Sequence, residues 1–339
     1  MDKQRRRFLR YAAAGGLAYA FGRTPGTVQA QVAGTGGFGD YKALVCLFLF
    51  GGNDSWNMFV PTSTAEYNAY ARSRGAGTSS SLAIDASALL PVTTATPPAD
   101  GVTFGFHPSM GDMRDLFNQG HAAVLANVGP LIRPTTKLQY QTPGHELPPQ
   151  LFSHNDQQDQ WHSLRGKAIL KSGWGGRVAD VLAAQTAGQQ LSLNVSLSGQ
   201  TFFQAGEQAR PYVMGATGAA AFSAFSANAL GAQRRAAFEA IAGASYGTVY
   251  ERGFAGVQQR AVQYADRVNA ALAGSRSFTA LPDSGTTLSP LATQLRTVAK
   301  MISARGTLAM SRQVFFVSTG GFDTHDDQVA DQPGLLGNV

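Results

Sequence analysis

The sequence predicts an α/β fold with a mostly parallel central sheet flanked by helices. Continuous apolar runs of strand length recur along the chain, and they do not alternate with polar residues. Such runs are typical of strands buried on both faces of a parallel sheet. Between them lie stretches with apolar residues at spacings of three and four, which favour helices packed on that sheet.

The elements follow in a simple order. The four predicted strands are Ala43–Phe50, Ala122–Val128, Leu191–Leu197 and Val314–Thr319, each closed by Gly or Ser. The three clearest predicted helices are Pro108–Phe117, Tyr250–Val268 and Leu288–Ile302. Two long segments rich in Ser, Thr, Ala or Pro, 75–101 and 130–149, are predicted to be loops outside the core. No break in composition divides the chain after residue 30 into two domains.

The net charge argues against a nucleic-acid partner. The 339 residues carry a formal charge of +6, but six basic residues and one acidic residue lie within residues 1–30 alone. The remainder is nearly neutral, whereas binding to phosphate backbones needs Lys and Arg clustered on one face. The single cysteine, Cys46, lies within a predicted strand and is interpreted as a small buried residue.

Residues 1–30 have the layout of an export signal. A cationic segment, Gln4–Arg10, precedes an apolar run, Tyr11–Phe21, and a small-residue cleavage pattern ending at Ala30. The apolar run is shorter than the ~20 residues that cross a bilayer, so no stable membrane span is expected. The paired arginines resemble a twin-arginine signal. We therefore expect residues 31–339 to be exported by the twin-arginine translocation machinery to a periplasmic or extracellular location.

Two strand ends carry the same motif. Strand 43–50 runs into Gly-Gly-Asn-Asp-Ser, and strand 314–319 runs into Gly-Gly-Phe-Asp-Thr-His. Glycines allow a sharp turn, and an Asp beyond a strand's carboxyl end lies where open α/β sheets bind ligands. Asp54, Asp323 and His325 are therefore candidate ligands of a divalent metal, which would be Zn, Mn, Mg or Ca. The alternative is that each Asp only stabilises a turn.

A second polar cluster begins at Ser153. Ser153 with Asp156 three residues later indicates the start of a helix, where the serine caps the first turn. The same position offers free backbone N–H groups to an anion. Ser153 is therefore also a candidate nucleophile or anion contact, and His154 a candidate ligand or base. His107, before Pro108, is interpreted as the end of a loop.

These motifs, taken in order, resemble the exported bacterial proteins grouped as domain of unknown function 1501. The segments that carry the resemblance are the twin-arginine signal, LFLFGGNDSWNMFVP, FHPSM, AVLANVGPL, LFSHNDQQDQW, SGWGGRVAD and FFVSTGGFDTHDDQ. The resemblance implies a relation to the alkaline phosphatase and sulfatase superfamily. It further implies an alkaline-phosphatase-like fold, with Asp54 as the first-strand metal ligand and Asp323 with His325 as a later ligand pair.

The resemblance also implies further segments beyond residue 339, which would make this chain a fragment, incomplete at the C-terminus. The leading hypothesis is a metal-dependent hydrolase of phosphate or sulfate esters, in which Ser153 or a metal-bound water attacks a small anionic ester. The alternative is a non-catalytic envelope or secretion-associated protein that keeps the scaffold and binds a partner or polysaccharide. In a third interpretation both Asp turns serve the fold only.

Overall fold

The computed structural model describes residues 38–96, 98–167, 172–189, 191–225 and 227–339. The predicted export signal lies outside these residues. The chain divides into two compact units, a division that the composition does not mark. Unit 1 comprises the described residues up to Phe48 and those within His162–Ser318, and unit 2 comprises the described residues within Leu49–Trp161 and Thr319–Val339.

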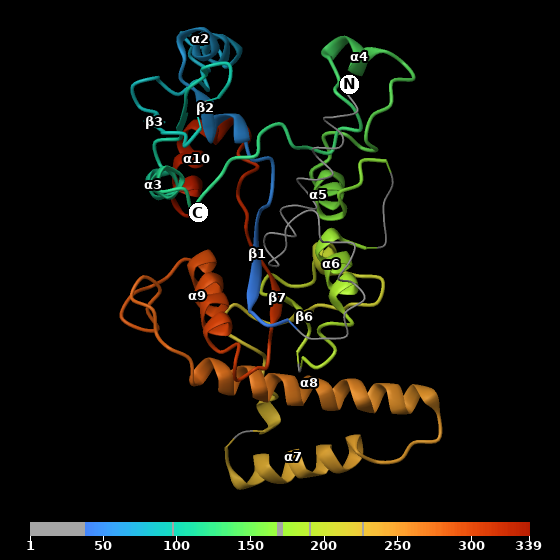
Figure 1. Ribbon diagram of the computed structural model, residues 1–339. Coiled ribbons are helices and arrows are strands. Elements are labelled where there is room, and N and C mark those ends of the chain that lie inside the picture. The colour runs from blue at the N-terminus through green and yellow to red at the C-terminus, as the bar shows by residue number, and fades with distance from the viewer. Residues whose placement is uncertain (1–37, 97, 168–171, 190, 226) are drawn as a thin grey trace. The chain divides into compact units, whose positions relative to one another are not determined.

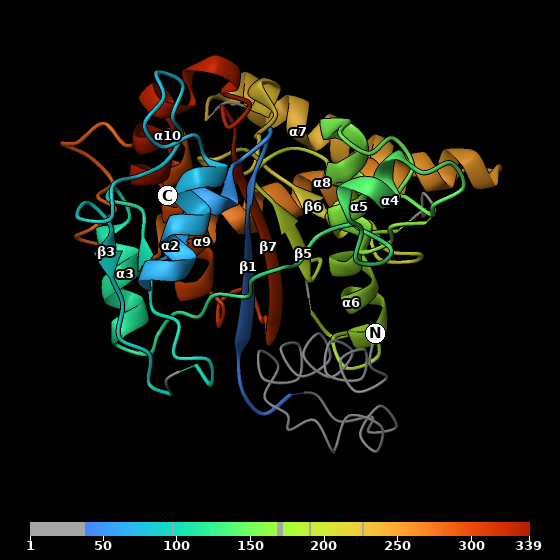
Figure 2. The same ribbon diagram turned by 90° about the horizontal axis from the view of Figure 1, so that it is seen from above.

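Unit 1 is built on a four-stranded sheet with the order β1-β7-β5-β6. The strands are β1 (Lys42–Leu49), β5 (Asn194–Ser196), β6 (Tyr212–Val213) and β7 (Arg312–Thr319). β5 pairs in parallel with both β6 and β7, with Val195 opposite Tyr212 and Phe315. Backbone bonds join the start of β1 to the start of β7 and the end of β1 to the end of β7, so this pair is also parallel. Figures 1 and 2 show β1 and β7 side by side. The predicted α/β class is confirmed.

Helices complete unit 1. They are α6 (Trp174–Leu182), α7 (Ala229–Ala242), α8 (Val249–Ala273) and α9 (Pro290–Ser303), with 3-10 turns η2 (Phe202–Gln204) and η3 (Ser223–Phe225). The predicted helices at 250–268 and 288–302 are confirmed by α8 and α9. Thr248 and Glu251 cap α8 reciprocally. The long α8 lies beside α7 in Figure 1.

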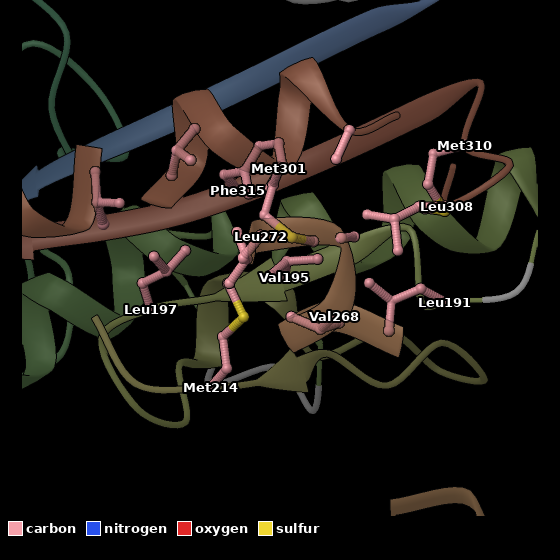
Figure 3. Packing of buried hydrophobic residues seen from close by; sticks show 14 of the residues in the cluster. Leu191, Val195, Leu197, Met214, Val268, Leu272, Met301, Leu308, Met310 and Phe315 are labelled. Atoms are coloured by element: carbon pink, nitrogen blue, oxygen red, sulfur yellow. The ribbon is translucent and has the colours of Figure 1, made fainter. Parts of the chain in front are cut away.

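The core of unit 1 lies between the sheet and two of these helices. Val195 and Phe315 of the sheet pack with Val268 of α8 and Met301 of α9, and all four are fully buried (Figure 3). The apolar spacings of α8 and α9 produce this contact, because they place their large side chains on one face. Burial of such side chains contributes roughly 1.5–3 kcal/mol each.

His162 occupies an aromatic cluster elsewhere in unit 1. Its ring centroid lies 4.5 Å from that of Phe48, 5.6 Å from Phe316 and 6.3 Å from Phe203. Burial lowers the pKa of His162 to about 4, because the apolar surroundings disfavour the charged imidazolium. His162 is therefore neutral at physiological pH.

Unit 2 contains a small antiparallel sheet that the sequence did not predict. Its order is β2-β4-β3, from β2 (Phe59–Pro61), β3 (Leu90–Pro91) and β4 (Phe104–Phe106). The helices are α2 (Thr64–Ser73), α3 (Gly111–Asn118), α4 (Lys137–Gln141), α5 (His154–Ser163, whose last two residues belong to unit 1) and α10 (Gln328–Gly337), with 3-10 turns η1 (Ser55–Asn57) and η4 (His325–Asp327). α3 confirms the helix predicted at 108–117. One buried cluster consists of Phe106, Met110, Phe322 and Leu336, and a second of Val60, Tyr70, Ala71 and Leu89.

The strand predicted at Ala122–Val128 is wrong. These residues form no strand, and Leu125 is 67% exposed. An apolar run becomes a strand only when a neighbouring strand takes up its backbone hydrogen bonds, and the described part of the chain supplies none here. The two predicted loops are largely irregular, although 75–101 contributes β3 and 130–149 contains α4. Among the described helices, none has the length and apolar character that a membrane crossing requires.

Candidate functional site

The two Gly-Gly turns meet in unit 2. The Phe50 N–H donates to the Thr319 carbonyl at 2.9 Å, and the Phe322 N–H donates to the Phe50 carbonyl at 3.4 Å. Gly51 has a φ of +112°, and a Cβ there would lie 2.5 Å from the backbone nitrogen of Asp323. Only glycine allows this backbone conformation and this approach. The repeated motif therefore places the segments after β1 and β7 against each other.

Asp323 lies between two imidazoles. Its Oδ1 atom is 3.1 Å from His154 Nε2 and 3.0 Å from His325 Nε2. An ionised carboxylate only accepts hydrogen bonds, so each imidazole donates its Nε2–H to the same oxygen. The side chains of Asp323 and His154 are each 46% exposed and that of His325 is 77% exposed. We call His154, Asp323 and His325 the His–Asp–His cluster.

Local backbone positions the members of this cluster. Gly52 packs beneath His154, because a Cβ on Gly52 would lie 2.8 Å from the imidazole Cε1. His325 has a φ of +46°, in the left-handed region that non-glycine residues seldom adopt. Strain of this kind concentrates at functional sites, although it also occurs in tight turns. Sequence reasoning selected all three cluster residues, but it did not foresee that His154 pairs with Asp323.

Asp54 is bound to other partners. Its carboxylate forms an ion pair with Arg74, accepts a hydrogen bond from Gln328 Nε2 at 2.6 Å and caps η1 through the Trp56 N–H at 3.1 Å. Gln332 Nε2 donates to the Asp54 backbone carbonyl at 3.0 Å. Within the described residues Asp54 makes no hydrogen bond to the His–Asp–His cluster. The side chain of Asp54 is only 10% exposed, and the Arg74 guanidinium neutralises its carboxylate.

Sequence reasoning missed the partners of Asp54. Gln328 and Gln332 are four residues apart on α10 and so share one helix face. That spacing is readable directly after the second Asp motif and could have suggested their role. Arg74 follows α2 with no distinguishing pattern, so only the structure assigns it to Asp54.

Ser153 caps α5, as the sequence predicts. Its Oγ donates to Asp156 Oδ2 at 2.5 Å, and the Asp156 backbone N–H donates back to Oγ at 3.4 Å. The preceding Phe152, with a φ of +77°, turns the chain into the helix. The cap is confirmed, whereas the nucleophilic role of Ser153 stays a prediction.

Within the described ranges, no group of three or more His, Cys, Asp or Glu side chains is arranged to hold a metal ion. The His–Asp–His cluster is instead hydrogen-bonded within itself. The cluster contains two of the metal ligands expected from the sequence, Asp323 and His325, together with His154. Cys46 takes no part, because burial raises the pKa of its thiol to about 11.

The fold and site define a class: an α/β protein whose adjacent parallel strands β1 and β7 lead into paired Gly-Gly-x-Asp turns, with the Asp of the second turn bound by His154 of α5 and by His325. The chain matches, over residues 41–339, the family described as "Protein of unknown function (DUF1501)" and belongs to that family. Comparison with curated proteins finds no match, and comparison with solved structures finds none either.

Proposed function

We propose that this DUF1501 protein is an exported, metal-dependent hydrolase of phosphate or sulfate esters, with an alkaline-phosphatase-like fold. The observation that carries the proposal is Asp323 Oδ1 held within 3.1 Å of two imidazole Nε2 atoms. One carboxylate and two imidazoles form a usual ligand set for catalytic zinc. Export would depend on residues 1–30, which lie outside the described residues.

The donor chemistry fits a divalent cation at the His–Asp–His cluster. Each imidazole would offer the lone pair of one ring nitrogen to the cation and keep its proton on the other, and Asp323 would contribute its carboxylate. The partial exposure of all three side chains gives them room to rotate from mutual hydrogen bonds towards a cation. Asp54 is left out of the proposed ligand set, because its carboxylate already pairs with Arg74 and accepts a hydrogen bond from Gln328. The proposed ligands are therefore His154, Asp323 and His325.

Ser153 is the proposed nucleophile. It precedes the ligand His154 directly, and its hydroxyl proton already points to Asp156 Oδ2 at 2.5 Å. Asp156 can accept this proton as Ser153 Oγ attacks the phosphorus or sulfur atom, which activates an otherwise weak nucleophile. The bond from that atom to the alcohol oxygen breaks, the alcohol leaves, and water then hydrolyses the ester formed on Ser153. A divalent cation bound at the cluster would polarise the ester oxygen.

Zinc titration of the purified protein tests the proposal. We expect one zinc per chain by calorimetry and elemental analysis, with binding abolished in Asp323→Asn and retained in His121→Gln, a change at an exposed histidine. Hydrolysis of p-nitrophenyl phosphate or p-nitrophenyl sulfate should depend on zinc and fall in Ser153→Ala. Absence of stoichiometric zinc binding in the wild-type protein would refute the metal-dependent function.

The arrangement of Asp54 favours a second function, that of a non-catalytic envelope-associated binding protein. One expected metal ligand is neutralised by Arg74, and large apolar side chains are exposed on α4 and just before α5, among them Leu138 and Phe152. Exposed apolar side chains of this kind are characteristic of partner-binding surfaces. In this case Asp323→Ala would leave the cellular phenotype intact, whereas deletion of Pro130–Pro149 would abolish it. If the protein is a hydrolase, Asp323→Ala should instead abolish the cellular phenotype.

A further inference from the structure

Unit 2 contains a cavity of about 250 Å³ that includes no member of the His–Asp–His cluster. Its wall comes from four places: the end of η1, the segment after α2, the connection from β4 to α3, and one face of α10. The lining residues are Asn57, Ser81, Leu82, Ala83, Ile84, His107, Pro108, Ser109, Gln328, Val329, Gln332 and Pro333. A Cβ built on Gly337 of α10 would lie 3.8 Å from Ser109 Cβ, so the end of α10 lies close to the segment that precedes α3.

His107 presents a fixed hydrogen-bond donor to this cavity. The Ser109 backbone N–H donates to His107 Nδ1 at 3.0 Å, so Nδ1 is an acceptor. Burial lowers the pKa of His107, which keeps the ring neutral at pH 7. A neutral imidazole whose Nδ1 accepts must carry its proton on Nε2. The tautomer is therefore set by the backbone.

The Nε2–H of His107 makes no hydrogen bond within the described part of the chain. The residue is only 5% exposed, but its Nε2 atom is not among the fully enclosed polar atoms that lack a partner, so it keeps some accessible surface. The partner of such a donor is either water or a ligand. Its place in the cavity wall means that this partner would occupy the cavity.

Gln328 and Ser109 supply complementary groups. The amide nitrogen of Gln328 is used by Asp54 Oδ2 and Gln332 Oε1, which leaves its carbonyl oxygen as an acceptor. The Ser109 hydroxyl makes no hydrogen bond within the described residues and can donate or accept. Asn57, in contrast, already donates to the Leu82 carbonyl and accepts from the Tyr70 hydroxyl, and we assign it no ligand contact.

The lining determines the class of ligand. None of the lining residues is charged when His107 is neutral, so a charged ligand would lose its hydration without compensation. The volume equals that of about eight waters at the ~30 Å³ each occupies in the liquid, which suits a molecule of roughly one sugar ring. Leu82, Ile84 and Val329 offer apolar surface to its C–H groups.

We propose that this cavity binds an uncharged, hydroxyl-rich molecule the size of a monosaccharide. One ligand hydroxyl accepts from His107 Nε2–H, another donates to Gln328 Oε1, and the Ser109 hydroxyl joins either. Hydroxyl groups suit this lining because each donates and accepts, as the fixed donor and acceptor require. The site is separate from the His–Asp–His cluster and does not depend on the proposed hydrolase.

Saturation-transfer NMR and calorimetry with D-glucose and D-galactose test the proposal on the complete protein. His107→Asn is the informative variant, because the Asn side-chain oxygen can still accept from the Ser109 N–H while the Nε2–H donor is lost. We expect saturable binding of at least one sugar, weakened about ten-fold in His107→Asn, which is the effect of losing one hydrogen bond. His121→Asn should bind as the wild type does.

Three further measurements test sugar binding at this cavity. Ser109→Ala should weaken sugar binding without changing the midpoint of urea unfolding, which covers the case in which His107→Asn fails to fold. The imidazole ¹⁵N spectrum should show a neutral Nε2–H tautomer whose resonance shifts when the sugar binds. Glucose 6-phosphate should bind more weakly than glucose. The proposal is overturned if neither sugar shows saturable binding up to about 0.1 M, which corresponds to a negligible affinity. It is also overturned if His107→Asn binds sugar as well as the wild type does. In either case the cavity holds water only.

Discussion

His154 and Asp323 lie 169 residues apart in the chain and are joined by a hydrogen bond of 3.1 Å between His154 Nε2 and Asp323 Oδ1. Two neighbouring glycines make this contact possible. Gly51 lets the backbone of Asp323 approach, and Gly52 leaves room for the His154 ring. The Gly-Gly pair is thus a steric requirement of the cluster, which leads to different predictions for the two glycines.

Gly51→Ala should destabilise the protein by roughly 2–4 kcal/mol, the range for overlap with backbone combined with strain. The new Cβ would lie 2.5 Å from the Asp323 backbone nitrogen at a φ of +112°, so backbone must move. Urea unfolding followed by circular dichroism measures the loss. Gly129→Ala, where a Cβ would meet nothing within 4 Å, is the control. A Gly51→Ala protein as stable as this control would contradict the steric argument.

Gly52→Ala should leave stability within about 1 kcal/mol of wild type but displace His154 from Asp323. Here the added Cβ meets a half-exposed imidazole at 2.8 Å, and a side chain can rotate away. The imidazole ¹⁵N resonances of His154 report the change directly. If the Nε2–H of His154 keeps its hydrogen-bonded shift in this variant, the assigned role of Gly52 is wrong.

Asp54→Asn should cost about 3 kcal/mol of stability, because it leaves the partly buried Arg74 without its counter-charge. In a double-mutant cycle with Arg74→Met, the two losses should be less than additive by about 1–3 kcal/mol. Zinc affinity should not change, since Asp54 lies outside the His–Asp–His cluster. Loss of zinc binding in Asp54→Asn would instead show that Asp54 is a metal ligand.

His162 should make unit 1 sensitive to acid. The unfolded residue takes up a proton near pH 6.5, whereas burial holds the folded pKa at about 4. Unfolding therefore binds a proton in this window, so stability is complete above about pH 6.5 and falls towards pH 4, by up to about 1.4 kcal/mol per pH unit.

Urea midpoints at several pH values across this window measure the effect, with His162→Phe as the comparison. Burial also lowers the pKa of His107, so the wild-type slope contains contributions from both histidines. The difference between wild type and His162→Phe isolates His162. Parallel pH profiles of the two proteins would be inconsistent with a neutral buried imidazole.

Cys46 should be unreactive in the folded protein. Burial in β1 raises the pKa of its thiol to about 11, so very little thiolate exists near pH 8. A disulfide reagent such as DTNB should release about one equivalent of its chromophore only after denaturation. Rapid labelling of the native protein would show that the strand is more open than described.

Several features of the fold could be predicted from local pattern. The strands at 43–50 and 314–319 and the helices at 250–268 and 288–302 were predicted close to their observed limits, because long apolar runs and regular spacings reflect burial directly. The antiparallel sheet of unit 2 was missed, since its strands have only two or three residues each. The run at 122–128 was misassigned, because an apolar pattern does not indicate whether a partner strand exists.

The sequence predicted which residues form the candidate site, but it did not predict which of them bind to one another. Residue type and motif selected Asp54, Ser153, His154, Asp323 and His325. The repeated Gly-Gly turns further predicted that the segments after β1 and β7 serve one region, and Gly51 does lie against Asp323. Neither motif revealed that Arg74 neutralises the first aspartate, or that His154 reaches the second.

By itself the sequence determined the α/β class, the main strands and helices and the residues able to carry chemistry. These depend on interactions between residues close in the chain, which periodicity and turn composition record. Only the tertiary structure decided that Asp54 is paired with Arg74, that Asp323 is shared by two imidazoles and that His107 faces a cavity with an unused donor. The physical reason is that hydrogen bonds and ion pairs are satisfied in space, by partners whose separation along the chain no local pattern encodes.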